Sequence, residues 1–103
     1  MIRGEIRWYR FDRPDKKRPV LLLTRNVGIE VLAEVTVVPI TSTVRGIPSE
    51  VFLDGNDGMP RGCAANFDHL QTVPQAKIGA LIATLGSNRM HEVRSALLFA
   101  LGF

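Results

Sequence analysis

The chain has 103 residues, a length typical of one domain, and 46% of them are hydrophobic and 22% charged. A chain of this size can bury one compact core, which excludes a large enzyme with an internal cavity. No apolar stretch approaches the ~20 residues of a membrane helix, the N-terminus lacks a signal-peptide region, and the single cysteine, Cys63, excludes a disulfide framework. We therefore expect one domain over residues 1–103, in the cytoplasm and with no membrane contact.

The formal net charge is +3, but the positive charge is concentrated at the N-terminus. Residues 1–25 contain eight Lys or Arg residues and three acids, so this segment carries +5 and the other 78 residues carry −2. Such an asymmetry fits a polyanionic partner for one face, and it fits a solvated basic surface equally well.

Three β-favouring runs open the chain. Separated by polar or glycine-containing connections at 12–17 and 25–33, they predict strands at 5–11, 19–24 and 34–40. The run PVLLLT is continuously apolar, as in a strand buried on both faces. Pro39 lacks an N–H donor and is expected at a strand end, an edge or a bulge.

The second half of the chain alternates short β-rich runs with turns. A polar loop at 41–48 precedes a predicted strand at 49–53, and DGNDGMPRG at 54–62 is the strongest turn signal in the chain. Two short strands or one bent strand are expected at 63–66 and 68–73, a helical turn at 74–77 and a strand at 78–85.

The last segment has helical periodicity, with apolar residues on one face from Met90 to Leu101. It predicts a helix over 88–101, with Ser87 as N-cap and Gly102 just past the end. Leu98 and Phe99 make more than one stripe of this helix apolar, which fits contact with a second subunit or partner, or a helix deep on its own sheet. Five or six short strands with one terminal helix predict a small, strongly bent sheet or barrel.

The residues present leave few types of catalytic chemistry open. His69 and His91 have no spacing typical of a metal site, and the chain has no phosphate loop of the GxxxxGKS type and no GxSxG motif. A Cys63–His69 nucleophile pair is conceivable, although a cysteine beside a glycine is more often a small strand residue.

Several side chains could bind phosphate. Arg18 precedes Pro19 at a strand start, and its planar fork of donors suits a phosphate or a pentacoordinate phosphorus transition state. The hydroxyl residues Thr41, Ser42 and Thr43 follow the run 34–40, where they could contact phosphate or bond the local backbone. Asp68 and His69 could orient an arginine or exchange protons, or be ordinary surface residues.

The order and spacing of four motifs resemble those of the MazF/PemK (Kid-like) toxins of bacterial toxin–antitoxin modules. They are RGEI at 3–6, KRPVLLLT at 17–24, VTVVPITST at 35–43 and DHLQT at 68–72. The segment TVVPITSTVRG at 36–46 is similar to the mycobacterial branch of this family. The resemblance spans nearly the whole chain.

This resemblance implies an SH3-like barrel of the CcdB/MazF type, with mostly antiparallel strands and a C-terminal helix, and a homodimer. It implies a sequence-specific endoribonuclease that cleaves single-stranded RNA without a metal or other cofactor. By their positions in the motifs, the catalytic residues would be Arg18, Thr41 and Asp68. The family's longer first loop is reduced here to DRPDKK, and His69 and Gln71 replace its usual Gln and Arg.

These groups fit attack of the RNA's own 2′-OH on the neighbouring phosphorus, which gives a 2′,3′-cyclic phosphate and a 5′-OH. The resemblance also implies a MazE-type antitoxin partner. A non-catalytic CcdB-like gyrase inhibitor and an SH3-like RNA- or peptide-binding module remain alternatives. The further residues expected to bind RNA are Arg10, Arg13, Lys16, Lys17, Ser42, Thr43, Arg45 and His69, with Trp8 and Tyr9 as stacking candidates.

Overall fold

The structure, a computed structural model, describes residues 1–12 and 17–103. Within these described residues, seven strands form one sheet whose paired neighbours are all antiparallel. The strands are β1 (Glu5–Arg10), β2 (Lys17–Leu22), β3 (Glu34–Thr41), β4 (Glu50–Leu53), β5 (Cys63–Asn66), β6 (Gln71–Pro74) and β7 (Ile78–Thr84). The helices are α1 (Asn26–Val31), α2 (Ser87–Leu101) and three 3-10 helices at Gly55–Asp57, Phe67–His69 and Gln75–Lys77.

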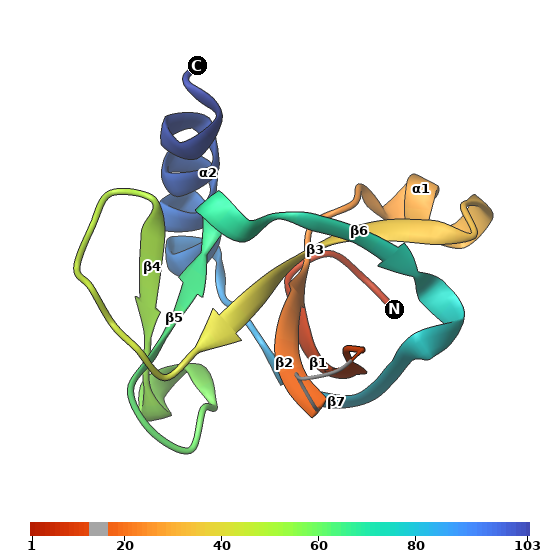
Figure 1. The fold of residues 1–103 in the computed structure, drawn as a ribbon, viewed down its shortest axis with the longest axis horizontal. Helices are drawn as coiled ribbons and strands as arrows, with labels where there is room; N and C mark the ends of the chain where they lie inside the picture. Colours follow the sequence, from red (N-terminus) through yellow and green to blue (C-terminus); the bar gives the residue numbers. More distant parts are fainter. Residues whose placement is uncertain (13–16) are drawn as a thin grey trace.

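The order of strands in the sheet is β4-β5-β3-β2-β1-β7, and β6 also pairs with β3. The sheet bends strongly (Figure 1), but the hydrogen-bonded path between the described strands runs from β4 to β7 without closing. The predicted mostly antiparallel fold with a C-terminal helix is therefore confirmed, whereas a fully closed barrel is not.

Strand β3 is the centre of this arrangement because it pairs with three strands. Its first half pairs with β6 as far as Val37, and its end pairs with β5 from Ile40 onward, while β2 lies along its other edge. Pro39 falls between these two partner strands, where a missing N–H donor breaks no ladder. The predicted irregularity at Pro39 is thus a change of partner within one strand.

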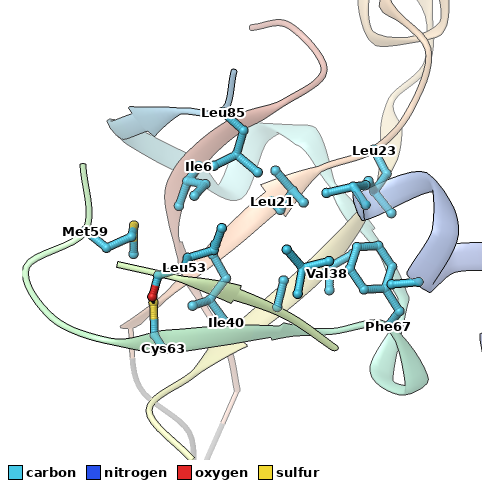
Figure 2. Close-up of a cluster of buried hydrophobic side chains, with 14 residues drawn as sticks. Ile6, Leu21, Leu23, Val38, Ile40, Leu53, Met59, Cys63, Phe67 and Leu85 are labelled. Carbon is cyan, nitrogen blue, oxygen red and sulfur yellow. The ribbon is translucent and has the colours of Figure 1, made fainter. Parts of the chain in front are cut away.

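Two buried clusters lie on opposite faces of the central strands. Leu21 and Val38 belong to the larger cluster, and Val20 and Val37 to the smaller. Val20, Leu21 and Leu22 of β2 are all buried, so this part of the strand is covered on both faces, as the continuously apolar run PVLLLT predicted. Figure 2 shows the larger cluster, with Met59 and Cys63 toward one end and Phe67 toward the other.

Helix α2 closes the larger cluster with Val93 and Ala96. Its predicted Ser87 cap is wrong, because the N-cap is Gly86 and no side chain caps the helix. Gly102 ends the helix at φ 81°, as predicted. The C-terminal end of the helix projects away from the sheet (Figure 1), and Phe99 and Leu101 are exposed there.

Helix α1 lies in a segment for which the sequence predicted only a connection. The other expected elements are present, and the doubtful region after residue 62 forms two strands separated by a 3-10 helix. Across residues 1–12 and 17–103, no helix has the length and hydropathy needed to span a bilayer.

Candidate active site

The register of β2 against β3 brings two predicted site residues together. The pairing of β2 with β3 ends at Val20 and Pro39. Arg18 lies two residues before Val20 and Thr41 two residues after Pro39, and both side chains line the same two cavities. The guanidinium and the hydroxyl therefore share one end of the sheet.

Two cavities flank this pair. The larger has a volume of about 420 Å³ and the smaller about 170 Å³. Arg18, Thr41 and Thr43 line both of them. The larger cavity is completed by Trp8, Pro19, Ile40, Ser42 and the segment Met59–Cys63, and the smaller by Pro39, Arg45, Asn66 and His69.

The sequence predicted two roles for the Thr41 hydroxyl, a bond to the local backbone and a contact to phosphate, and the structure allows both. Its oxygen accepts a hydrogen bond of 3.1 Å from the Thr43 backbone N–H, which is the local turn contact. A hydroxyl that accepts one hydrogen bond still has its own proton to donate. Thr41 can therefore stabilise the turn and donate to a phosphate oxygen at the same time.

The aromatic wall of the larger cavity comes from Trp8, which is half-buried. The Lys17 ammonium lies 4.9 Å from the centre of its ring, a cation–π contact. Arg10 and Lys17 line a further small cavity of about 160 Å³ beside Trp8 and Tyr9.

Tyr9 is buried and packs edge-on against Phe11, so its ring face is not available for stacking on a ligand. Two further predicted RNA contacts, Arg13 and Lys16, lie outside the described residues.

The smaller cavity has a polar wall. Its loop is held in place because the backbone N–H groups of Arg45 and Gly46 donate to Glu50 at 2.9 and 3.2 Å. Arg45 and His69, two predicted RNA contacts, lie here with Arg18. The pattern of the sequence missed Asn66, a buried residue that also lines this cavity.

Asp68 lines neither cavity. One of its carboxylate oxygens accepts a 2.7 Å hydrogen bond from the buried Ser49 hydroxyl, and its backbone N–H donates to the Asn66 side chain at 2.9 Å. These contacts join the 3-10 helix at Phe67–His69 to the start of β4 and to β5. Its neighbours Asn66 and His69 line the smaller cavity together with Arg18.

The Cys63 thiol is poorly suited to nucleophilic catalysis. It is buried and donates a 3.7 Å hydrogen bond to the Leu53 carbonyl oxygen. Burial raises the pKa of this thiol above its ordinary value, and the negative charges of Asp57 and Asp54 raise it further. In the described part of the chain, no group of three or more His, Cys, Asp or Glu side chains could hold a metal ion.

The larger cavity also has a cation that the sequence analysis did not single out. Arg61 lies on its rim, in a segment that the sequence identified only as a turn. The available signal was the arginine itself, because a basic residue inside the strongest turn of a chain is solvent-facing and free to contact a ligand.

This geometry agrees with the comparison to known proteins. Residues 2–101 match the family described as PemK-like, MazF-like toxin of type II toxin–antitoxin system. The chain belongs to this family. The resemblance that the motifs indicated is thus confirmed over almost the whole length of the chain.

Relatives of this PemK/MazF-like toxin carry matching names. It is 45% identical over 83 residues to the endoribonuclease MazF3 of Mycobacterium tuberculosis, a match that covers 81% of each chain. It is 36% identical over 96 residues to the probable endoribonuclease MazF5 of the same organism, covering 92% of this chain and 87% of the other.

Solved structures show the same fold. The M. tuberculosis toxin MazF-mt6 superimposes with a TM-score of 0.88 at 35% identity, covering 96% of this chain and 97% of the other. A mycobacterial endoribonuclease in complex with its cognate antitoxin gives 0.89 at 26% identity, covering 100% and 96%.

Proposed function

We propose that this toxin is an endoribonuclease that cleaves single-stranded RNA by using the RNA's own 2′-OH. The observation that carries the proposal is that Arg18 and Thr41 both line the two cavities at this end of the sheet. The names of the relatives support the reaction class, and the basic N-terminal segment supports a polyanionic substrate.

In the proposed reaction the 2′ oxygen forms a bond to phosphorus while the bond from phosphorus to the 5′ oxygen breaks. The 2′-OH proton is lost, and the leaving 5′ oxygen takes up a proton, so the products are a 2′,3′-cyclic phosphate and a 5′-OH. The RNA supplies the nucleophile, so the protein must align the two oxygens and stabilise the added negative charge.

The two central residues would share this work. Arg18 would contact the scissile phosphate with its fork of donors, because a guanidinium stays charged at neutral pH and is suited to stabilising charge rather than carrying protons. Thr41 would donate its hydroxyl proton to a phosphate oxygen. Asp68 would act indirectly, by holding the smaller cavity's wall through Ser49 and Asn66.

The test is incubation of the purified protein with single-stranded RNA of random sequence in EDTA, followed by analysis of the new ends. We expect 5′-OH ends and cyclic phosphates, and loss of cleavage in a folded Arg18→Ala variant. Ends carrying a 5′-phosphate would contradict the mechanism. Absence of cleavage would favour a gyrase-inhibiting toxin, or a binding module if RNA were bound in a salt-dependent way.

We further propose that the 103 residues act as one cytoplasmic domain, as a homodimer, and that a MazE-type antitoxin inhibits it. The exposed apolar residues Phe99, Leu101 and Phe103 at the end of α2 support a protein contact there. A related endoribonuclease has been solved with its cognate antitoxin. Sedimentation of the purified toxin tests the dimer, and a monomer at micromolar concentration would contradict it.

A further inference from the structure

The rim of the larger cavity contains a second arginine whose role the proposed reaction does not use. Arg61 is exposed, lines the cavity and makes no side-chain hydrogen bond or ion pair with any other described residue. Arg18 faces the same space from β2. A cavity of this volume, within the ~300–1,000 Å³ of ligand sites, therefore receives positive charge from two separate elements.

The segment that carries Arg61 is held by a capped turn. The Asp54 side chain accepts a hydrogen bond from the Asn56 N–H at 2.9 Å, and the Asp57 side chain accepts one from the Asp54 N–H at 3.0 Å. This reciprocal capping fixes the 3-10 helix at Gly55–Asp57. These hydrogen bonds fix the backbone of the turn on the N-terminal side of Arg61.

An ion pair anchors the same turn to α2. Arg89 donates from Nε to both carboxylate oxygens of Asp57, at 3.0 and 3.2 Å, and from a second nitrogen to Glu92. The Asp57 side chain is only 8% exposed. Burial opposes its ionisation, but the hydrogen bonds from Arg89 and the Asp54 N–H outweigh this and lower its pKa below the ordinary value.

Three packing contacts complete the anchoring. Gly58 has φ 86°, and a Cβ on it would lie 3.0 Å from the Ala83 Cβ of β7. A Cβ on Gly62 would lie 3.2 Å from the Phe52 ring of β4. Between them Met59 is buried in the larger cluster, where Figure 2 shows its side chain near Leu53.

We propose that Arg61 is an RNA-binding residue that holds a backbone phosphate next to the scissile one, while Arg18 holds the scissile phosphate itself. The inference rests on the proposed function, since it names a second contact to the same substrate. Because the turn is anchored to α2, β4 and β7, its backbone need not be ordered on binding, and the only ordering cost is that of the Arg61 side chain itself. A guanidinium–phosphate contact is a charge-assisted hydrogen bond strong enough to exceed that cost. Trp8, which lines the same cavity, offers a ring for the intervening base.

The test measures binding of a fluorescent 12-nucleotide RNA of random sequence whose 2′ oxygens are methylated, so that it cannot be cleaved. Anisotropy at several NaCl concentrations gives the affinity and its salt slope for wild type, Arg61→Ala and Arg61→Lys. We expect Arg61→Ala to bind about ten-fold more weakly. Its slope should be shallower by about 0.7, the value for one phosphate contact on a single strand. Arg61→Lys keeps the charge and should keep the wild-type slope.

Arg94→Ala is the matched control, because Arg94 is an exposed arginine of α2 that lines neither cavity. It should leave affinity and slope unchanged. Wild-type binding by Arg61→Ala, or weaker binding with an unchanged slope, would overturn the inference. So would failure of the wild-type protein to bind the probe. Arg61-dependent binding without cleavage of unmodified RNA would support this inference and contradict the proposed nuclease instead.

Discussion

The two cavities beside Arg18 and Thr41 are built from different kinds of structure. The larger one lies between Trp8 and the turn before β5, and that turn is fixed by an ion pair to α2 and by buried Met59. The smaller one is walled by a polar loop and a 3-10 helix that are held by hydrogen bonds to carboxylates. One side is anchored mainly by the core, the other mainly by a polar network.

We therefore expect the two cavities to bind different parts of the RNA. The larger cavity has the volume, the aromatic ring and the second arginine that a nucleotide needs. The smaller one, about 170 Å³ and polar, suits a phosphate or ribose contact rather than a base. Arg18 and Thr41 belong to both, so changes to them should have larger effects than changes to either side alone.

Thr41→Val should therefore cause a larger loss of activity than a change confined to one cavity. It removes the hydroxyl proton donor while keeping the β-branched shape, and loss of one preorganised donor to a developing charge lowers kcat by about 10²-fold. The measurement is single-turnover cleavage of RNA. Thr41→Ser should retain most of the wild-type rate. Thr72 is an exposed residue of β6 that lines neither cavity, so Thr72→Val should leave the cleavage rate unchanged.

Arg45→Ala should weaken RNA binding in the smaller cavity only. Arg45 is exposed, and its backbone N–H, which the variant retains, is the group that holds Glu50. Loss of one exposed charge contact should raise KM about five-fold with kcat nearly unchanged, the pattern of lost uniform binding. Steady-state kinetics measure it, and a fall in kcat with unchanged KM would place Arg45 at the reacting phosphate instead.

Asp57→Asn should have the smallest direct effect on chemistry and should act on stability. The Asp57 pKa is lowered from its ordinary value of 3.8, so the ionised side chain stabilises the fold above that pH. The stabilisation disappears as the pH falls through the folded-state pKa. Urea unfolding should show wild type about 1 kcal/mol more stable than Asp57→Asn at pH 7, with the two converging as the pH falls below the folded-state pKa. A difference that persists at low pH would contradict the role of the ion pair.

Much of the fold was predictable because local pattern and tertiary structure agree. The run PVLLLT needed no knowledge of its neighbours to be assigned to a buried strand, and Gly102 marks the end of α2 as expected. Helix α1 was missed because it has no side-chain N-cap and contains Gly28 and β-branched residues. Its carbonyls are satisfied from far along the chain, by the Gln75 side-chain amide at 2.6 Å from Ile29 O.

At the candidate site, too, some residues were predictable from the sequence and others were not. Motif order alone indicated Arg18 and Thr41, because both lie in family motifs at strand ends, and their roles remain proposals. Nothing in the linear pattern connected Asp57 to Arg89, 32 residues away, or showed that this contact anchors the turn that carries Arg61. Nor did it show that Asp68 is bonded to Ser49 and lies outside both cavities.

The sequence by itself determined the strands, the C-terminal helix and the family of this protein, because hydrophobic period, turn residues and motif spacing are properties of neighbouring residues. Only the tertiary structure decided which charges face one another. The pairing of β2 with β3 brought Arg18 and Thr41 to one cavity, and the 54–62 turn, packed on α2, β4 and β7, placed Arg61 at the same cavity. Such contacts depend on three-dimensional packing between distant segments, which no local pattern specifies.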